Sequence, residues 1–250
     1  MQAKRLSAVQ GVQWIAEGFR LYRSNPPLLS SLTLGYLMVV IVLQLVPLLG
    51  PLAVAVALPA MTVVLGNGCR IIDGKQRVAL PALRAGIDRN MPALLRLGLV
   101  QLGGSIAIIL LGMVLFGEPP DPEQAKPQDV LRGLLLLLPL LLPLMLLLWY
   151  APYLVAWHGV TVAKSLFFSI AAVIRNTGAF VVFFISAAVL GIGVPFGLMS
   201  ALSAGGSPPA ILRVVMELIV LLVLAPTLAA AVYVSYRDVF DADVGTGAPH

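Results

Sequence analysis

The sequence has little charge, histidine or cysteine. Only 11% of its 250 residues are charged, whereas a typical soluble domain has about 25%. Cys69 is the one cysteine, which excludes an intramolecular disulfide and a cysteine-rich metal site. The two histidines, His158 and His250, are far apart in the chain and leave a histidine-based metal site or catalytic triad without its parts.

Motifs of known catalytic chemistry are also missing. The sequence contains no HExxH or GxSxG motif and no phosphate-binding loop, and its apolar segments hold no pair of carboxylates. Its basic residues form no run with interleaved aromatics, unlike a nucleic-acid-binding surface. We therefore expect a protein that is not an enzyme, uses no cofactor or metal and binds no nucleic acid.

Apolar residues make up 60% of the chain instead. They are concentrated in six segments of about the length that a helix needs to cross a bilayer. A soluble fold could not bury so much apolar surface, so lipid is the expected solvent. The sequence predicts an all-α membrane protein with six transmembrane helices in one integral membrane domain, residues 1–250. The expected spans are residues 28–49, 52–72, 91–116, 131–157, 179–202 and 210–233.

Three similar elbows divide the chain. In each, a charged, amphipathic lead-in ends in Arg and Asn, and a long apolar run follows. The elbow asparagines are Asn25, Asn90 and Asn176. This pattern predicts three repeats of an amphipathic surface helix followed by a helical hairpin. The predicted repeats are residues 6–72, 79–157 and 159–237, followed by a flexible tail over residues 238–250.

The surface helices are recognised by apolar stripes. The first, over residues 6–23, has a polar face that includes Glu17, and the third, over residues 159–175, has Ser169 opposite its stripe. The first stripe consists of Leu6, Val9, Val12, Ile15, Phe19 and Tyr22. The third consists of Ala163, Leu166, Phe167, Ile170 and Ile174. The second, shorter stripe consists of Leu80, Leu83 and Ile87. The first stripe fits contact with lipid and contact with the protein's own loops equally well.

Prolines interrupt the even-numbered spans and predict kinks, because proline frees carbonyl groups that neighbouring helices must satisfy. The predicted kinks are at Pro59, Pro139, Pro143, Pro152 and Pro226. Small residues recur at four-residue spacing in the fifth span, at Gly193, Gly197 and Ala201. That spacing lets another helix approach closely, within one chain or between two copies. Asn67, flanked by two glycines, is a candidate hinge.

Few polar residues fall within the spans, where a charge near the bilayer centre costs on the order of 3 kcal/mol. Glu217 follows Arg213 by one helical turn in the sixth span. We expect an ion pair between them near the outer surface, the alternative being a proton-responsive carboxylate in a transport path. Gln101 and Gln44 are expected to bond to other helices, and Arg96 to extend to the cytoplasmic surface.

The distribution of positive charge predicts the orientation. Thirteen of the sixteen Lys and Arg lie on the side of the elbows, and only Lys126, Arg132 and Arg213 lie on the other. By the positive-inside rule, both termini are expected to be cytoplasmic. Anionic lipid headgroups at the cytoplasmic face are the expected partners. A homo-oligomer or a membrane-protein partner is also compatible with the sequence.

Several segments resemble a known family. The WIAEGFRLYRSNP start, the LVPLLGP hairpin, Pro59 and the GCRIIDGK segment resemble uncharacterised proteobacterial inner-membrane proteins with six spans, over essentially the whole chain. More distantly, the chain is similar to the membrane domain of some glycerophosphodiester phosphodiesterases. No catalytic domain is expected beside the spans here, so that activity does not carry over. The resemblance implies an inner-membrane helical bundle without an established activity.

Two functional hypotheses follow. The first is a non-enzymatic polytopic protein that organises or senses the bilayer or scaffolds a membrane partner, with its surface helices on anionic lipid. The second is a transporter or channel for a small solute or lipid that uses the proline-broken helices and Glu217. Three hairpins in a row differ from the two inverted halves of many transporters, which favours the first hypothesis.

Overall fold

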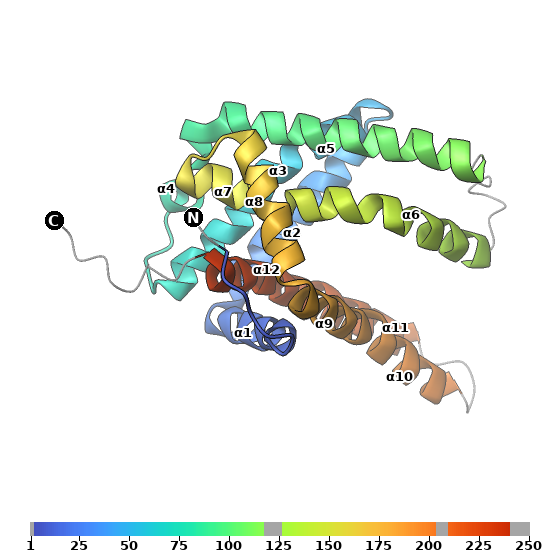
Figure 1. The fold of residues 1–250 in the computed structure, drawn as a ribbon. Helices are drawn as coiled ribbons and strands as arrows, with labels where there is room; N and C mark the ends of the chain where they lie inside the picture. The colour runs from blue at the N-terminus through green and yellow to red at the C-terminus, as the bar shows by residue number, and fades with distance from the viewer. Residues whose placement is uncertain (1–2, 118–126, 204–209, 241–250) are drawn as a thin grey trace. The chain divides into compact units, whose positions relative to one another are not determined.

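The computed structural model describes residues 3–117, 127–203 and 210–240 (Figure 1). Within these ranges the regular elements are all helical, and six helical stretches are long and apolar enough to cross a membrane. Their bounds are Pro26–Gln44, Leu49–Asp73, Leu80–Phe116, Leu135–His158, Thr177–Leu202 and Ile211–Phe240. The expected all-α fold with six candidate transmembrane helices is therefore confirmed.

Three spans consist of one helix and three are divided. The undivided spans are α2 (Pro26–Gln44), α3 (Leu49–Asp73) and α5 (Ile87–Phe116). The fourth span consists of α6 (Pro127–Leu148) and α7 (Ala151–His158). The fifth consists of α9 (Thr177–Ala188), η1 (Val189–Gly193) and α10 (Val194–Ser203). The sixth consists of α11 (Ala210–Ile219), η2 (Val220–Leu224) and α12 (Ala225–Phe240). The remaining helices are α1 (Gln10–Ser24), α4 (Leu80–Leu83) and α8 (Val162–Arg175).

The chain forms two compact units. Unit 1 consists of Met1–Ile41, Val63–Ala85 and Ala171–His250, and unit 2 consists of Val42–Thr62 and Gly86–Ile170. Both α3 and α8 have residues in each unit. The limits of the units do not coincide with those of the three predicted repeats, which remain a prediction.

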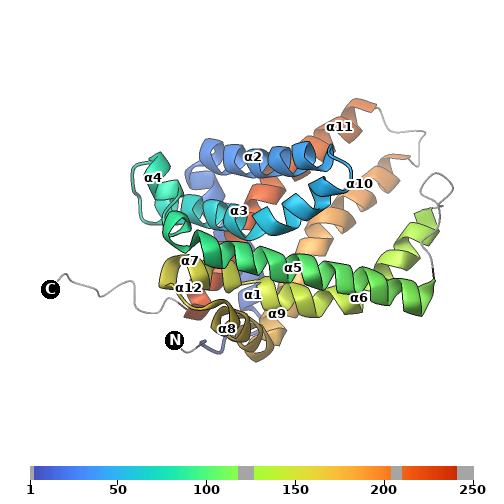
Figure 2. The ribbon, with the colours of Figure 1, turned by 90° about the horizontal axis from the view of Figure 1, so that it is seen from above.

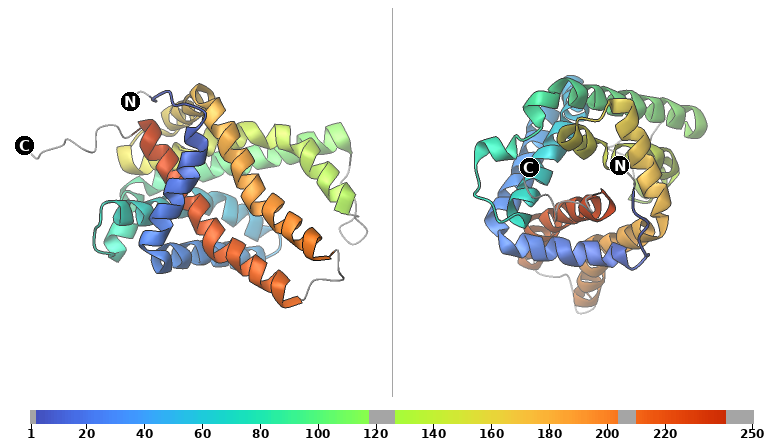
Figure 3. Two further views of the ribbon diagram at one scale, coloured as in Figure 1. Left: turned by 90° about the horizontal axis from the view of Figure 1, so that it is seen from below. Right: turned by 60° about the vertical axis from the view of Figure 1, so that its left-hand side comes forward.

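In unit 1, α1 lies across α9 and α12 (Figure 3). Two glycines allow this close approach, since a Cβ added at Gly18 would lie 2.7 Å from Ala231 N, and one at Gly11 would meet the α9 backbone. Between them, Trp14 is fully buried and packs edge-on against Phe180, with 5.4 Å between ring centroids. Close backbone packing and one large aromatic side chain thus hold α1 on the two spans.

The apolar stripe predicted on α1 is not its buried face. Ile15 is buried, but Val9, Val12 and Phe19 are 63%, 49% and 41% exposed. The glycines pack more closely against the spans than these large side chains could, so the stripe is turned outward. Leu6 precedes the helix, which begins at Gln10.

In unit 2, α5 and α6 run antiparallel, side by side (Figures 1 and 2). Glycines of α5 again lie at the contact. A Cβ added at Gly112 would lie 2.8 Å from Leu137 Cδ2, and one at Gly104 would lie 2.6 Å from Leu144 Cδ1. Small residues therefore set the separation of these two helices, as is common where lipid provides no hydrophobic driving force.

The face of α8 that packs on the protein carries serines. Ser165 and Ser169 are fully buried. Ser169 Oγ donates a hydrogen bond to Leu146 O over 2.9 Å and accepts one from Tyr150 N over 3.0 Å, at the break between α6 and α7. The hydroxyl satisfies backbone groups that the break leaves without helical partners. Ser169 thus lies opposite the exposed stripe residues Phe167 and Ile174, as the sequence placed it, and its side of the helix is the one that packs on the protein.

The outward side of α8 carries the apolar stripe instead. Phe167 and Ile174 are 65% and 63% exposed. Helices α1 and α8 therefore share one feature: several large apolar residues of the predicted stripe face away from the protein, although Ile15 of the α1 stripe is buried.

Two other predicted boundaries need correction. The second surface helix, α4, has only four residues, and Gly86, with φ of 78°, separates it from α5. The left-handed conformation suits glycine and prevents one continuous helix. The expected flexible tail also begins too early, because α12 continues to Phe240 and includes Asp238. The rest of that tail, residues 241–250, lies outside the described part of the chain.

The fifth and sixth spans each contain one π-helical turn, η1 and η2, and these turns contact each other. A π-turn widens the helix and disturbs its hydrogen bonds. Two hydroxyls bond to carbonyls of η2: Ser30 Oγ of α2 donates to Leu222 O over 3.1 Å, and Thr227 Oγ1 donates to Val223 O over 2.7 Å. The irregular backbone thus obtains polar partners from the protein, as lipid requires.

Candidate functional site

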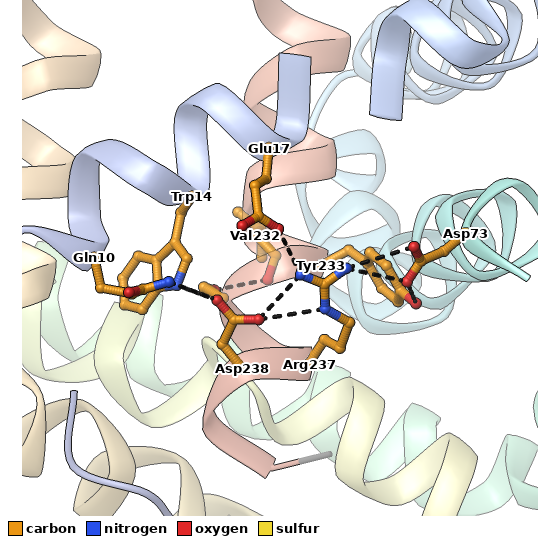
Figure 4. Close-up of polar contacts among 9 residues, drawn as sticks. Gln10, Trp14, Glu17, Asp73, Val232, Tyr233, Arg237 and Asp238 are labelled. Atoms are coloured by element: carbon orange, nitrogen blue, oxygen red, sulfur yellow. Dashed lines mark hydrogen bonds and ion pairs between the residues drawn. The ribbon is translucent and has the colours of Figure 1, made fainter. Parts of the chain in front are cut away.

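A cluster of charged side chains joins three helices of unit 1 (Figure 4). Arg237, in the last turn of α12, lies at its centre. Its Nη2 lies 2.6 Å from Glu17 Oε2 of α1 and 3.1 Å from Asp238 Oδ1, and its Nη1 lies 3.3 Å from Asp73 Oδ2 of α3. One guanidinium therefore bridges a surface helix and two spans.

Neutral groups complete the cluster. Trp14 Nε1 and Gln10 Nε2 donate to Asp238 Oδ2 over 3.2 and 3.0 Å. The Tyr233 hydroxyl donates to Asp73 Oδ2 over 3.0 Å. Three carboxylates thus share one cation and three neutral donors, so within this group negative charge exceeds positive charge.

Two cavities lie beside the cluster, and Asp73 lines both. The larger has a volume of about 410 Å³, and its polar lining consists of Asn67, Arg70, Asp73, Gln76 and Tyr233. The smaller has a volume of about 180 Å³, and its polar lining consists of Glu17, Arg20, Ser24, Asp73, Lys75 and Arg237. Both cavities have polar linings and lie beside Asp73, the last residue of α3.

The elbow asparagine Asn176 is 2% exposed and forms three hydrogen bonds. Its Nδ2 donates to Ala172 O and to Lys4 O, each over 2.9 Å, and its Oδ1 accepts from Leu6 N over 2.7 Å. The side chain ends α8 and fastens the segment that leads into α1.

Asn90 has a similar arrangement in unit 2. Its Nδ2 donates to Gly86 O over 2.9 Å and to Ala156 O over 3.2 Å. Like Asn176, it bonds to the carbonyl four residues earlier and to one distant in sequence. Asn25 differs. Its Oδ1 accepts a hydrogen bond from Leu28 N over 3.2 Å, which caps the start of α2.

Asn67, the candidate hinge, anchors a neighbouring segment in this structure, and its role as a hinge remains a prediction. The side chain is 2% exposed, and its Nδ2 donates to Leu83 O and Ala85 O over 2.8 and 3.0 Å. The segment before α5 is thereby held on α3. Similarly, α1, which precedes the first span, packs on α12 of the sixth span. Helix α8, which precedes the fifth span, bonds to the break between α6 and α7 in the fourth span. Each segment before an odd-numbered span thus contacts an even-numbered span.

The polar residues singled out within the spans do not form a site. Glu217 and Arg213 are both exposed, and the part of the chain that the structure describes has no ion pair between them. Gln44 and Arg96 are exposed and Gln101 is half-buried. No hydrogen bond between helices involves either glutamine within the described residues, and the ion pair and the interhelical bonds remain predictions.

The predicted kinks fall into two groups. Pro152 lies in the first turn of α7 and Pro226 in that of α12, where their spans are interrupted, whereas Pro59 lies inside the continuous α3. All three are buried. Pro139 and Pro143 lie inside α6 and are exposed.

The small residues at four-residue spacing lie on an exposed side of the fifth span. Gly193, Gly197 and Ala201 are all exposed, and no atom lies within 4 Å of a Cβ added at Gly197. Gly191 contacts the sixth span instead, 3.4 Å from Leu224 Cδ2 by the same measure. That another helix packs closely at Gly193, Gly197 and Ala201, for instance from a second copy of the chain, remains a prediction.

The charged cluster was missed by reasoning from sequence. Glu17 was assigned to a polar helix face, and Asp73 and Tyr233 were treated as ordinary residues of a span end. One signal was present: Arg237 follows Pro226 by the same interval as Arg70 follows Pro59. That interval marks the ends of the spans but cannot show that Glu17, 220 residues away, lies beside Arg237.

Within the described ranges, no group of three or more His, Cys, Asp and Glu side chains is arranged to hold a metal ion. The cluster instead fixes helices to one another and supplies charged walls for the two cavities.

The comparisons with known proteins identify a relative. A probable inner membrane protein of Burkholderia thailandensis is 30% identical over 258 residues, which cover 96% of this chain and 94% of that protein. The chain belongs to the family of that protein. No family model matches it, and no solved structure matches it. The family membership and the six apolar helices give a polytopic inner-membrane protein, whereas the resemblance to glycerophosphodiester phosphodiesterases has no support.

Proposed function

We propose that this protein is a non-enzymatic component of the bacterial inner membrane that organises or senses the bilayer through its surface helices. One observation carries the proposal. In both α1 and α8, several large apolar side chains face outward, as with Phe19 and Phe167, which are 41% and 65% exposed. An outward apolar edge on a helix that lies at the end of membrane spans suits insertion between lipid headgroups.

Basic residues accompany the apolar edges. Arg20 and Arg23 are exposed in the last part of α1, and the Arg23 guanidinium carbon lies 5.9 Å from the centre of the Phe19 ring. Lys164 and Arg175 are exposed on α8. Each basic residue near an anionic membrane surface contributes about 1 kcal/mol of attraction. The preferred surface is therefore anionic lipid at the cytoplasmic face, with both termini cytoplasmic, as the charge distribution favours.

Lipid selectivity tests this proposal. Protein reconstituted with spin-labelled phosphatidylglycerol or phosphatidylcholine reports which lipid is enriched around it. We expect the native chain to prefer the anionic lipid, and Arg20→Gln with Arg23→Gln to reduce that preference. Arg213→Gln, at the opposite predicted surface, is the matched control and should change little. Equal preference in all three proteins would contradict the proposal.

The transport hypothesis gains no specific support. Glu217, the residue it depends on, is exposed, and the two cavities described above lie at the other end of the sixth span, beside Arg237. A role as scaffold for a membrane partner fits the proposal, since the exposed side of α10 with Gly197 offers a helix a close approach.

A further inference from the structure

The smaller cavity beside Arg237 has both basic and acidic walls. Arg20 and Lys75 line it, are exposed, and take part in no ion pair within the described chain. Glu17 and Asp73 also line it, and they share the single cation Arg237 with Asp238. The lining of the cavity therefore combines the cations of Arg20 and Lys75 with the carboxylates of Glu17 and Asp73.

Its position is that of a bilayer headgroup region. Asp73 is the last residue of α3, Arg237 lies in the last turn of α12, and α1 lies across this end of α12. Besides Ser24 and Arg237, the rest of the lining is apolar and consists of Leu21, Ile72 and Val234. A polar cavity with an apolar side at the end of two spans matches the boundary between headgroups and acyl chains.

We propose that this cavity binds the headgroup of a phospholipid that carries a primary ammonium beside its phosphate. Arg20 and Lys75 hold the phosphate, and Glu17 and Asp73 accept hydrogen bonds from the ammonium. A choline headgroup has the same charge but no N–H to donate, and a glycerol headgroup has no cation. The inference goes beyond the proposed function. It requires a lipid headgroup in the cavity beside Arg237, but it does not require anionic lipid along the outward sides of α1 and α8.

Lipid retention by the full-length protein tests the site. The protein is placed in lipid nanodiscs that contain equal amounts of phosphoethanolamine, phosphocholine and phosphoglycerol lipids with the same acyl chains, and bound lipid is measured by native mass spectrometry. We expect the phosphoethanolamine lipid to be retained over the phosphocholine lipid by roughly fivefold, as expected of a partly exposed charge pair. Equal retention of all three lipids would overturn the proposal.

Two variants and a matched control locate the binding. Glu17→Gln and Lys75→Gln each change one wall and should each abolish the preference. Asp238→Asn also removes a carboxylate from Arg237, but Asp238 lines neither cavity, so the preference should persist. Loss of the preference in Asp238→Asn, or its persistence in Glu17→Gln and Lys75→Gln, would contradict the assignment. Arg20→Gln replaces either variant if that variant does not fold.

A soluble competitor separates a lipid from a free metabolite. Glycerophosphoethanolamine has the same headgroup without acyl chains. We expect a millimolar excess to leave the retained lipid in place, because the acyl chains hold the lipid in the bilayer. Complete displacement would show a site for a soluble molecule and overturn the lipid assignment. Neither the retained lipid nor its displacement by the competitor depends on the preference for anionic lipid that tests the proposed function.

Discussion

Arg237 of α12 and Glu17 of α1 form an ion pair with 2.6 Å between Nη2 and Oε2, although 220 residues separate them in the chain. Their side chains are 31% and 30% exposed, so the pair lies at the edge of the protein and not in its interior. It joins a surface helix to a span, and Asp73 of α3 joins the same cation. The position of α1 on α12 thus depends on contacts from both ends of the sequence.

Removing that cation should loosen unit 1. Arg237→Gln leaves Glu17, Asp73 and Asp238 without their common partner, and we expect a loss of about 1–3 kcal/mol in the free energy of unfolding. Arg20→Gln, an exposed arginine without an ion pair in the described chain, is the control and should cost less than about 0.5 kcal/mol. Unfolding in mixed detergent micelles measures both. A similar loss in the two variants would show that the cluster adds no stability.

The close approach of α1 to α12 predicts a steric effect. A Cβ at Gly18 would lie 2.7 Å from both Ala231 N and Thr227 O, which are backbone atoms that cannot turn aside. Gly18→Ala should therefore separate the helices and cost about 1–3 kcal/mol. Gly35→Ala is the matched control, because no atom lies within 4 Å of its added Cβ. The control should be neutral or stabilising in the same unfolding experiment, and a stable Gly18→Ala protein would contradict the packing.

The buried amide of Asn67 should contribute more to the free energy of unfolding than the half-buried amide of Gln101. Asn67→Ala removes two hydrogen bonds to Leu83 O and Ala85 O and leaves those carbonyls without that donor. We expect a loss of about 1–3 kcal/mol and faster hydrogen exchange in residues 80–86. Gln101→Ala is the comparison, since Gln101 forms no hydrogen bond to another helix within the described residues, and it should have little effect. Unchanged exchange in Asn67→Ala would mean that this segment is held by other contacts.

The spans could be predicted from the sequence because each is a local property. Twenty or so consecutive apolar residues need a bilayer whatever surrounds them, and the elbow asparagines marked where spans begin. Which face of a surface helix packs could not be predicted in this way. Ser169 reads as polar and exposed, yet it is buried because a break near Pro152 supplies backbone partners for its hydroxyl. The cluster around Arg237 depends on residues far apart in sequence, which no local pattern brings together.

The orientation predicts which loop can be labelled from outside. In a Cys69→Ser background, a cysteine at Gln124, outside the described residues, should react with an impermeant maleimide in intact cells. A cysteine at Lys75, at the opposite end of a span, should not. Cys69 itself is fully buried, so it should react slowly even in permeabilised cells. Labelling at Lys75 and not at Gln124 would reverse the topology.

The central claim is that the outward edge of α1 lies in an anionic bilayer surface, and a pair of neighbouring residues tests it most directly. Val12 is on the apolar edge and Gln13 on the polar side, and both are exposed. Trp14 is fully buried and cannot report on lipid, so a fluorophore is attached to Val12→Cys or Gln13→Cys, each with Cys69→Ser.

Quenching by brominated lipid is then compared in neutral and anionic nanodiscs. The account predicts strong quenching at Val12, increased in the anionic bilayer, and weak quenching at Gln13 in both bilayers. Equal quenching at the two positions, without dependence on lipid charge, would contradict it.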